Sequence, residues 1–168
     1  MARIDPPLQG TERESLMSWL QYHRDTLAIK CAGLEPAQLC TRPVPPSTMS
    51  LIGLVRHMAE VERGWFRRLP AGEGDDTAGR IYCSEGNRDG DFDDVDPMTV
   101  DEAMSTWRAE CDRADGIVAG LDLDETRVHA RRGATSVRWV LNHMIEEYAR
   151  HNGHADLLRE CIDGATGS

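Results

Sequence analysis

The stretch SVRWVLNHMIEEYARHNGHADLLREC, residues 136–161, predicts one long helix whose middle is rich in ionisable side chains. One stripe of residues runs along it at spacings of four and three, which is the repeat of a single helical face. The members of this stripe are Val140, Met144, Glu147, His151, His154 and Leu158. Because apolar residues stand at both ends of the stripe, we expect the titratable groups between them to be partly buried.

Ionisable side chains that face a core are costly unless something pairs with them, and a divalent cation does so directly. Glu147 and His151 are four residues apart, so they rise about 6 Å along one face and can share one ion. A third ligand must come from another helix, and His57, within a second apolar stripe, is the best candidate. These three residues would leave a fourth coordination position open, as in catalytic zinc sites.

Two further histidines lie close to this pattern in the sequence. His143 precedes Glu147 by four positions and is a rival ligand on spacing alone. His154 follows His151 by three and could be a ligand, a group behind the ligands or a substrate contact. Both also have an ordinary structural interpretation, because Glu–His pairs are common on solvated helices and core histidines bond to neighbours. We take His154 and His143 as candidate catalytic proton carriers.

Outward from this helix, the chain shows three more segments with helical spacing and no convincing strand. The four expected helices cover residues 11–32, 50–69, 99–121 and 136–162. Thr99 and Glu102 match a capping box at the start of the third helix. Four amphipathic helices without strands predict an all-α fold, namely a four-helix bundle that forms a single domain over residues 1–168. We expect the end of the chain, residues 164–168, to be a flexible tail.

Residues 71–97 form a long, acidic, glycine-rich connection between the second and third expected helices. This length favours a crossover connection, and loops this long are usually lids, binding loops or mobile crossings. Asp91, Asp93 and Glu102 resemble part of a calcium loop, but Asp96 stands where that motif requires glycine. We therefore expect a solvated loop that is more mobile than the helices and flanks the mouth of the metal site.

Charge and composition exclude several classes of function. The 168 residues include 29 Asp and Glu against 19 Lys and Arg, and this formal net charge of -10 does not attract nucleic acid or anionic membranes. No apolar run approaches the roughly 20 residues that span a bilayer, and residues 1–10 lack the apolar segment of a signal peptide. We therefore expect a cytoplasmic protein without a nucleic-acid or membrane partner. The five cysteines have no C-x-x-C spacing, which favours reduced, small core residues.

Two stretches, LIGLVRHMAEVERGWFRRL at 51–69 and the opening stretch at 136–161, resemble the signature segments of the DinB-like superfamily. They are most similar to its actinobacterial branch, related to mycothiol S-transferases and mycothiol-dependent maleylpyruvate isomerases. The resemblance implies an up-down-down-up bundle, a divalent metal such as zinc or nickel and, for many members, a homodimer. It also implies that His57, Glu147 and His151 are the ligands. Many members of the superfamily use three histidines, whereas the isomerases resemble the variant with two histidines and one glutamate. A carboxylate ligand also suits manganese or iron.

The resemblance points to a metal-dependent thiol S-transferase. In this interpretation the metal binds a low-molecular-weight, mycothiol-like thiol as the thiolate, which attacks a small electrophile. Two alternatives stay open: a metal-dependent hydrolase or isomerase that uses metal-bound water, and a non-catalytic metal-binding stress protein. Trp65, Trp139 and Tyr148 could form the walls of a substrate pocket or pack in the core.

Overall fold

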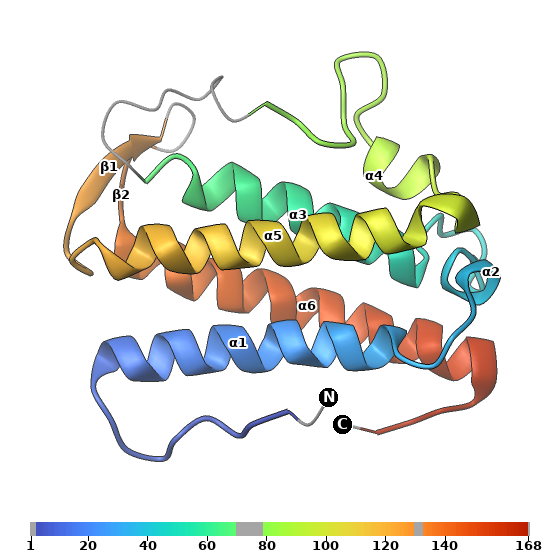
Figure 1. Ribbon diagram of the computed structural model, residues 1–168, viewed down its shortest axis with the longest axis horizontal. Helices are drawn as coiled ribbons and strands as arrows, with labels where there is room; N and C mark the ends of the chain where they lie inside the picture. Colours follow the sequence, from blue (N-terminus) through green and yellow to red (C-terminus); the bar gives the residue numbers. More distant parts are fainter. Residues whose placement is uncertain (1–2, 70–78, 130–132, 168) are drawn as a thin grey trace.

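The computed structural model describes residues 3–69, 79–129 and 133–167, and most of them are helical (Figure 1). The four long helices are α1 (Glu12–Cys31), α3 (Leu51–Phe66), α5 (Val100–Ala119) and α6 (Val137–Asp163). Each agrees with a predicted segment to within a few residues, which is the usual uncertainty of helix ends. The helical class predicted from periodicity is therefore confirmed.

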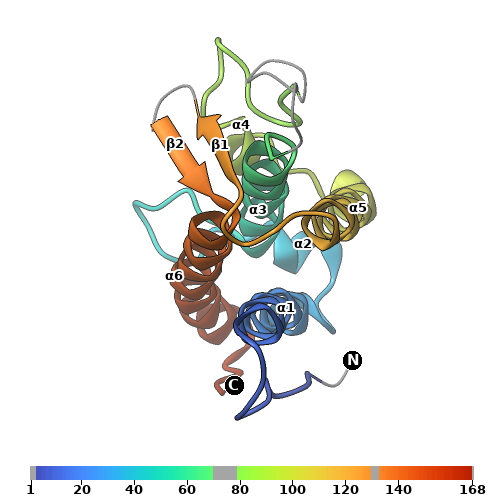
Figure 2. The same cartoon turned by 90° about the vertical axis from the view of Figure 1, so that its left-hand side faces the viewer.

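The four long helices pack side by side in two directions. Figure 1 shows that α1 and α6 run one way, whereas α3 and α5 run the other way. Seen nearly end-on in Figure 2, α3 lies between α5 and α6, and α1 lies against α6. Helices α3 and α5 are therefore parallel to each other, and antiparallel to α1 and α6.

Serine side chains set the start of the two helices that carry the candidate ligands. Ser50 accepts a hydrogen bond from the Gly53 amide at 3.1 Å, and this caps α3. Ser136 accepts one from the Trp139 amide at 3.1 Å and caps α6 in the same way. Each bond satisfies an amide that has no partner within the first helical turn. Ser50 and Ser136 are therefore the N-cap residues of α3 and α6.

Helix α5 does not begin with the predicted capping box. The Thr99 hydroxyl donates to the carbonyl oxygen of Asp96 at 3.0 Å instead of accepting from the helix. The Asp96 carboxylate accepts a hydrogen bond from the Met98 amide at 2.8 Å. Both bonds belong to a 3-10 turn, η1 (Pro97–Thr99), that precedes the helix. The predicted capping box of Thr99 with Glu102 is therefore wrong, because the threonine hydroxyl is turned toward the carbonyl oxygen of Asp96 and accepts no hydrogen bond from the helix.

A two-stranded antiparallel sheet is the element that helical periodicity did not predict. Strand β1 (Thr126–His129) pairs with β2 (Gly133–Ser136), and Thr126 lies opposite Ser136. Gly133 has a φ of 77°, a left-handed conformation that glycine adopts readily. Strands of four residues are too short for an alternating pattern to stand out. The expectation that the chain has no strand is therefore wrong.

Both ends of the described chain lie against α1, on the side opposite to α4 (Figures 1 and 2). Near the start, Arg3 donates a hydrogen bond to the Thr26 hydroxyl at 2.9 Å. Near the end, the Lys30 ammonium group donates to the carbonyl oxygen of Gly167. The flexibility of the tail at 164–168 stays a prediction.

The core is apolar, and side chains from all four long helices contribute to one buried cluster. Two one-turn helices, α2 (Pro36–Leu39) and α4 (Gly90–Asp93), lie in the connections on either side of α3. Among the residues that the structure describes, no helix is both long and apolar enough to cross a membrane.

One polar group of four side chains lies within this core, and we call Arg24, Glu62, Trp107 and Tyr148 the closed cluster. Arg24 donates to both carboxylate oxygens of Glu62, at 2.8 and 2.9 Å. Tyr148 donates to Glu62 at 2.8 Å and accepts from the Trp107 indole at 2.8 Å. One side chain comes from each long helix, so these bonds join all four. Tyr148 is fully buried and packs in the core.

Candidate metal centre

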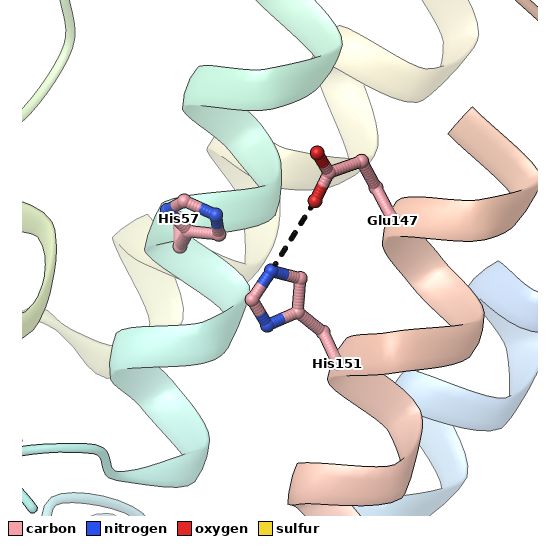
Figure 3. A group of neighbouring side chains, drawn as sticks. All are labelled: His57, Glu147 and His151. Atoms are coloured by element: carbon pink, nitrogen blue, oxygen red, sulfur yellow. Dashed lines mark ion pairs between the residues drawn. The ribbon is translucent and has the colours of Figure 1, made fainter. Parts of the chain in front are cut away.

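The three predicted ligands meet where α3 faces α6. His57 lies in the middle of α3, and Glu147 and His151 occupy successive turns of α6. Each offers one ligand atom, and these atoms all lie within 4.8 Å of one another. Figure 3 shows Glu147 and His151 extending from α6 toward the imidazole ring on α3. The structure therefore brings together the three residues that the sequence pattern singled out.

The distances in this group suit a shared cation better than direct hydrogen bonds. Nε2 of His151 lies 3.5 Å from Oε2 of Glu147, beyond the 2.7–3.2 Å range of ordinary N–H···O bonds. Two ligands of one tetrahedral zinc, with bonds of about 2.0–2.1 Å, stand about 3.3 Å apart. The rings of His57 and His151 meet edge-on, with centroids 4.7 Å apart and an angle of 63° between the rings. Two nitrogens and one oxygen form a donor set that a divalent metal accepts.

His151 is held in the form that binds metals. Its side chain is mostly buried, and the residue is only 9% exposed. Burial, together with the neighbouring His57 and His154, lowers the pKa of His151 to about 4, although Asp91 opposes the shift. Metals bind the neutral imidazole, so no proton has to be displaced from His151 near neutral pH.

Asp91 is the functional candidate that sequence reasoning missed. Its Oδ2 lies 2.8 Å from Nδ1 of His57, and the residue is buried. A carboxylate can only accept a hydrogen bond, so Nδ1 of His57 carries a proton, and Nε2 is the ring nitrogen left to bind a metal. In the sequence, Asp91 stood out only in the weak calcium-like pattern. Asp93 and Glu102, the other members of that pattern, are exposed.

The second connection is the chain between α3 and α5, and the part of it that the structure describes flanks the site. Residues 79–97 lie beside α3, where Oε1 of Glu60 accepts hydrogen bonds from three consecutive amides, those of Ile81, Tyr82 and Cys83. The first part of the expected acidic loop 71–97, up to residue 78, lies outside the described residues. The predicted mobility of the loop stays a prediction.

His154 lies directly beside the group of three. Its Nδ1 is 3.4 Å from Nδ1 of His151, and the two ring centroids are 5.4 Å apart. The residue is half-buried. This position suits a group that exchanges protons near the centre, which was one of the roles expected for it.

His143 lies on the other side of Glu147. Its Nε2 is 3.4 Å from Oε1 of Glu147, and its Nδ1 is 3.5 Å from Oε2 of Glu146. With these two glutamates it forms a second group of potential ligands that shares Glu147 with the first. The indole of Trp139 stacks on the His143 ring, and the Trp65 indole meets it edge-on. His143 is thus adjacent to the centre but belongs to a different group.

The cysteines do not supply a reactive thiolate beside this centre. Burial raises the pKa of Cys31 to about 12 and that of Cys83 to about 11, and it raises the pKa values of Cys40 and Cys111 as well. Such thiols stay protonated near neutral pH. Cys161 is exposed, but it follows His151 by ten positions, which is about 15 Å along α6.

Comparison with known protein families shows a match over most of the chain. The family model described as Mycothiol-S-transferase matches residues 15–164. The matched range contains His57, Glu147 and His151 as well as the whole second connection. Searches of curated proteins and of solved structures found no match.

Proposed function

The chain belongs to the mycothiol S-transferase family, and from this premise we propose that it is a metal-dependent thiol transferase. The reaction would join a low-molecular-weight thiol of the mycothiol type to a small electrophile. The observation that carries the proposal is the convergence of His57, Glu147 and His151 within 4.8 Å. The raised pKa values of Cys31 and Cys83 add support, because the sulfur is then expected to come from a second substrate.

We infer that Nε2 of His57, one carboxylate oxygen of Glu147 and Nε2 of His151 would hold the cation. Zinc suits this donor set, and nickel, manganese or iron are alternatives because a carboxylate replaces the usual third histidine. Three protein ligands leave space for a thiol sulfur. When bound, the cation lowers the pKa of a thiol and stabilises its anion.

His154 and His143, which lie beside the ligands, would accept and donate the protons of the reaction. The thiol gives up its proton, and the imidazole of His154, 3.4 Å from His151, is placed to accept it. The sulfur then forms a bond to the electrophilic carbon, and the leaving group departs with the electron pair of the broken bond. His143, on the far side of Glu147, is the alternative proton carrier. Holding both substrates in one site supplies much of the rate gain.

The proposal includes the finer features of the fold that the resemblance implies. These are a single DinB-like domain, an up-down-down-up bundle with a crossover between α3 and α5, and a homodimer. The helix directions in Figure 1 support the order of the helices.

Turnover assays with and without thiol test this function. The protein is loaded with zinc and given mycothiol and a chromogenic electrophile such as chlorodinitrobenzene. We expect product only when both the metal and the thiol are present. His57→Ala should abolish turnover and zinc binding, whereas His23→Ala should preserve both, since His23 bonds to Asn152 outside the centre. Turnover without any thiol would favour a metal-dependent hydrolase and contradict the proposal.

A second variant separates the two roles open to Glu147. Glu147→Gln removes a charged ligand, so zinc affinity should fall by more than the roughly 10–100-fold typical of groups behind the ligands. Turnover should recover, at least in part, when zinc is added in excess. A variant that stays inactive with zinc fully bound would show that Glu147 acts as a base and not only as a ligand. Zinc occupancy is measured on the same samples as turnover.

A further inference from the structure

Helix α4 packs beside the candidate metal centre, and two glycines make this packing possible: Gly53 where α4 meets α3, and Gly90 where α4 meets the segment before it. A Cβ atom at Gly90 would lie 2.5 Å from the carbonyl oxygen of Tyr82. A Cβ atom at Gly53 would lie 3.1 Å from Cδ1 of Phe92. The first separation is a clash with backbone and the second is tighter than normal packing. The contact of α4 with α3 therefore depends on glycine at position 53, and its contact with the segment around Tyr82 depends on glycine at position 90.

Polar side chains on α3 fasten α4 in this position. Nε of Arg56 donates to the carbonyl oxygen of Asp91 at 3.0 Å, and Nη2 donates to that of Gly90 at 2.8 Å. The Arg56 guanidinium also lies 4.1 Å from the centre of the Tyr82 ring. One turn further on, Glu60 binds the three amides that precede α4. Arg56 and Glu60 lie on either side of His57 in the sequence, so α3 makes these hydrogen bonds both before and after that ligand.

The result is that α4 holds the His57 ring from two sides. The Asp91 carboxylate meets its edge, with Oδ2 2.8 Å from Nδ1. Phe92 stacks on its face, with centroids 5.0 Å apart and an angle of 28° between the rings. Asp91 is itself fixed, since its Oδ1 accepts from the Phe92 amide at 3.1 Å and the residue is only 4% exposed. Neither rotation nor tilt of the imidazole is left free.

We propose that Asp91 is a positioning residue that keeps Nε2 of His57 aimed at the point shared with Glu147 and His151. The inference rests on the proposed metal centre and adds a partner behind one of its ligands. The bond to Asp91 keeps the proton on Nδ1, and a carboxylate in this place makes the imidazole a stronger ligand. The connection between α3 and α5 would therefore supply a residue that positions one of the metal ligands.

Cobalt and zinc binding to the whole protein tests this role. Affinities are measured by competition with a chromophoric chelator for wild type, Asp91→Ala and Asp91→Asn. Loss of the carboxylate in Asp91→Ala should weaken binding by about 10–100-fold. Asp91→Asn should lose less, because its amide oxygen can still accept from Nδ1. The visible spectrum of bound cobalt should change in Asp91→Ala, which a purely structural role would not cause in a folded variant.

Two further variants control the experiment. Asp93→Asn removes an exposed carboxylate two residues away and should leave both affinities within about twofold of wild type. Gly90→Ala keeps Asp91 but places a methyl group against the Tyr82 carbonyl, so α4 must shift and metal binding should weaken in the same direction. Thermal unfolding of the metal-free variants shows which of them are folded, and Asp91→Asn is the most conservative of the set.

The outcomes distinguish this inference from the proposed function. A wild type that binds neither cobalt nor zinc overturns the metal centre and the role of Asp91 with it. A wild type that binds metal while folded Asp91→Ala binds it equally well overturns the positioning role alone and leaves the centre intact. An equal loss in Asp93→Asn also overturns the role, because it would show a general effect of charge.

Discussion

Two groups of ionisable side chains on the same pair of helices are built in opposite ways. In the closed cluster, Glu62 of α3 and Tyr148 of α6 are 2.8 Å apart. We call His57, Glu147 and His151 the open cluster. In the sequence, His57 lies five residues before Glu62, and Glu147 lies directly before Tyr148. The nearest N–O pair of Glu147 and His151 is 3.5 Å apart.

This difference shows which group of side chains already has its hydrogen-bond partners and opposite charges in place. Buried charged groups are tolerated when hydrogen bonds and opposite charges satisfy them. In the closed cluster, its own side chains and Asp115 supply these partners, so it contributes to holding the helices together. The open cluster brings similar groups together without bonds of normal length, and a cation would satisfy them at once. Variants in the first should change stability, whereas variants in the second should change metal binding.

The largest effect is expected for Glu62→Gln. It removes the buried negative partner of Arg24, whose side chain is only 3% exposed, and leaves the guanidinium with the 42% exposed Asp115 as its remaining carboxylate partner. Breaking such a pair typically costs about 3–5 kcal/mol. Urea unfolding of the metal-free protein measures this loss. Zinc affinity of the folded fraction should stay close to that of wild type.

An exposed glutamate–arginine pair gives the matched control for this variant. Glu12 and Arg138 are 2.6 Å apart, but their side chains are 53% and 33% exposed. Glu12→Gln should therefore cost less than about 1 kcal/mol. If folded Glu62→Gln instead lost zinc affinity as His57→Ala does, the two clusters would not be independent.

A smaller effect concerns pH and the open cluster. In the metal-free protein the pKa of His151 is about 4, against about 6.5 for an unperturbed histidine. The unfolded chain therefore takes up a proton first, and the stabilisation from neutral His151 is lost as pH falls from 6.5 toward 4. The loss amounts to at most about 3 kcal/mol. Unfolding curves at several pH values should show a shallower decline for His151→Asn, and an identical decline would contradict this cause.

The smallest effect is expected for Tyr148→Phe. The change removes the hydroxyl between Glu62 and the Trp107 indole and leaves the indole N–H without that acceptor. A buried donor without a partner costs about 1–3 kcal/mol, so the loss in urea unfolding should be less than for Glu62→Gln. Although Tyr148 is next to Glu147 in the sequence, it points into the core, and zinc affinity should not change. A tenfold loss of zinc affinity would contradict the claim that the closed cluster affects stability without affecting metal binding.

The long helices and the three candidate ligands could be predicted because both depend on regular spacing. A helical face repeats every three or four residues, and Glu147 and His151 follow that repeat within an otherwise apolar stripe. The DinB-like resemblance added the family, which the match over residues 15–164 confirms. The identity of the metal, the dimer and the thiol stay predictions.

The rest could not be predicted because it depends on contacts between segments that have no repeat of their own. Asp91 is one acidic residue among many in the second connection, and only the packing of α4 on α3 gives it a role. The same holds for Arg24 and Glu62, which are 38 positions apart and meet inside the core. The hairpin at β1 and β2 was missed because four-residue strands carry little pattern.

The placement of both chain ends against α1 has a practical consequence for handling the protein. Arg3 and Gly167 are each tied to that helix, on the side opposite to α4. A tag, a resin or a fused partner joined to either end would therefore attach at the back of the molecule, leaving the connection around α4 exposed to solution. The proximity of the ends also suits a circular permutant, in which a short linker joins them and new ends open elsewhere.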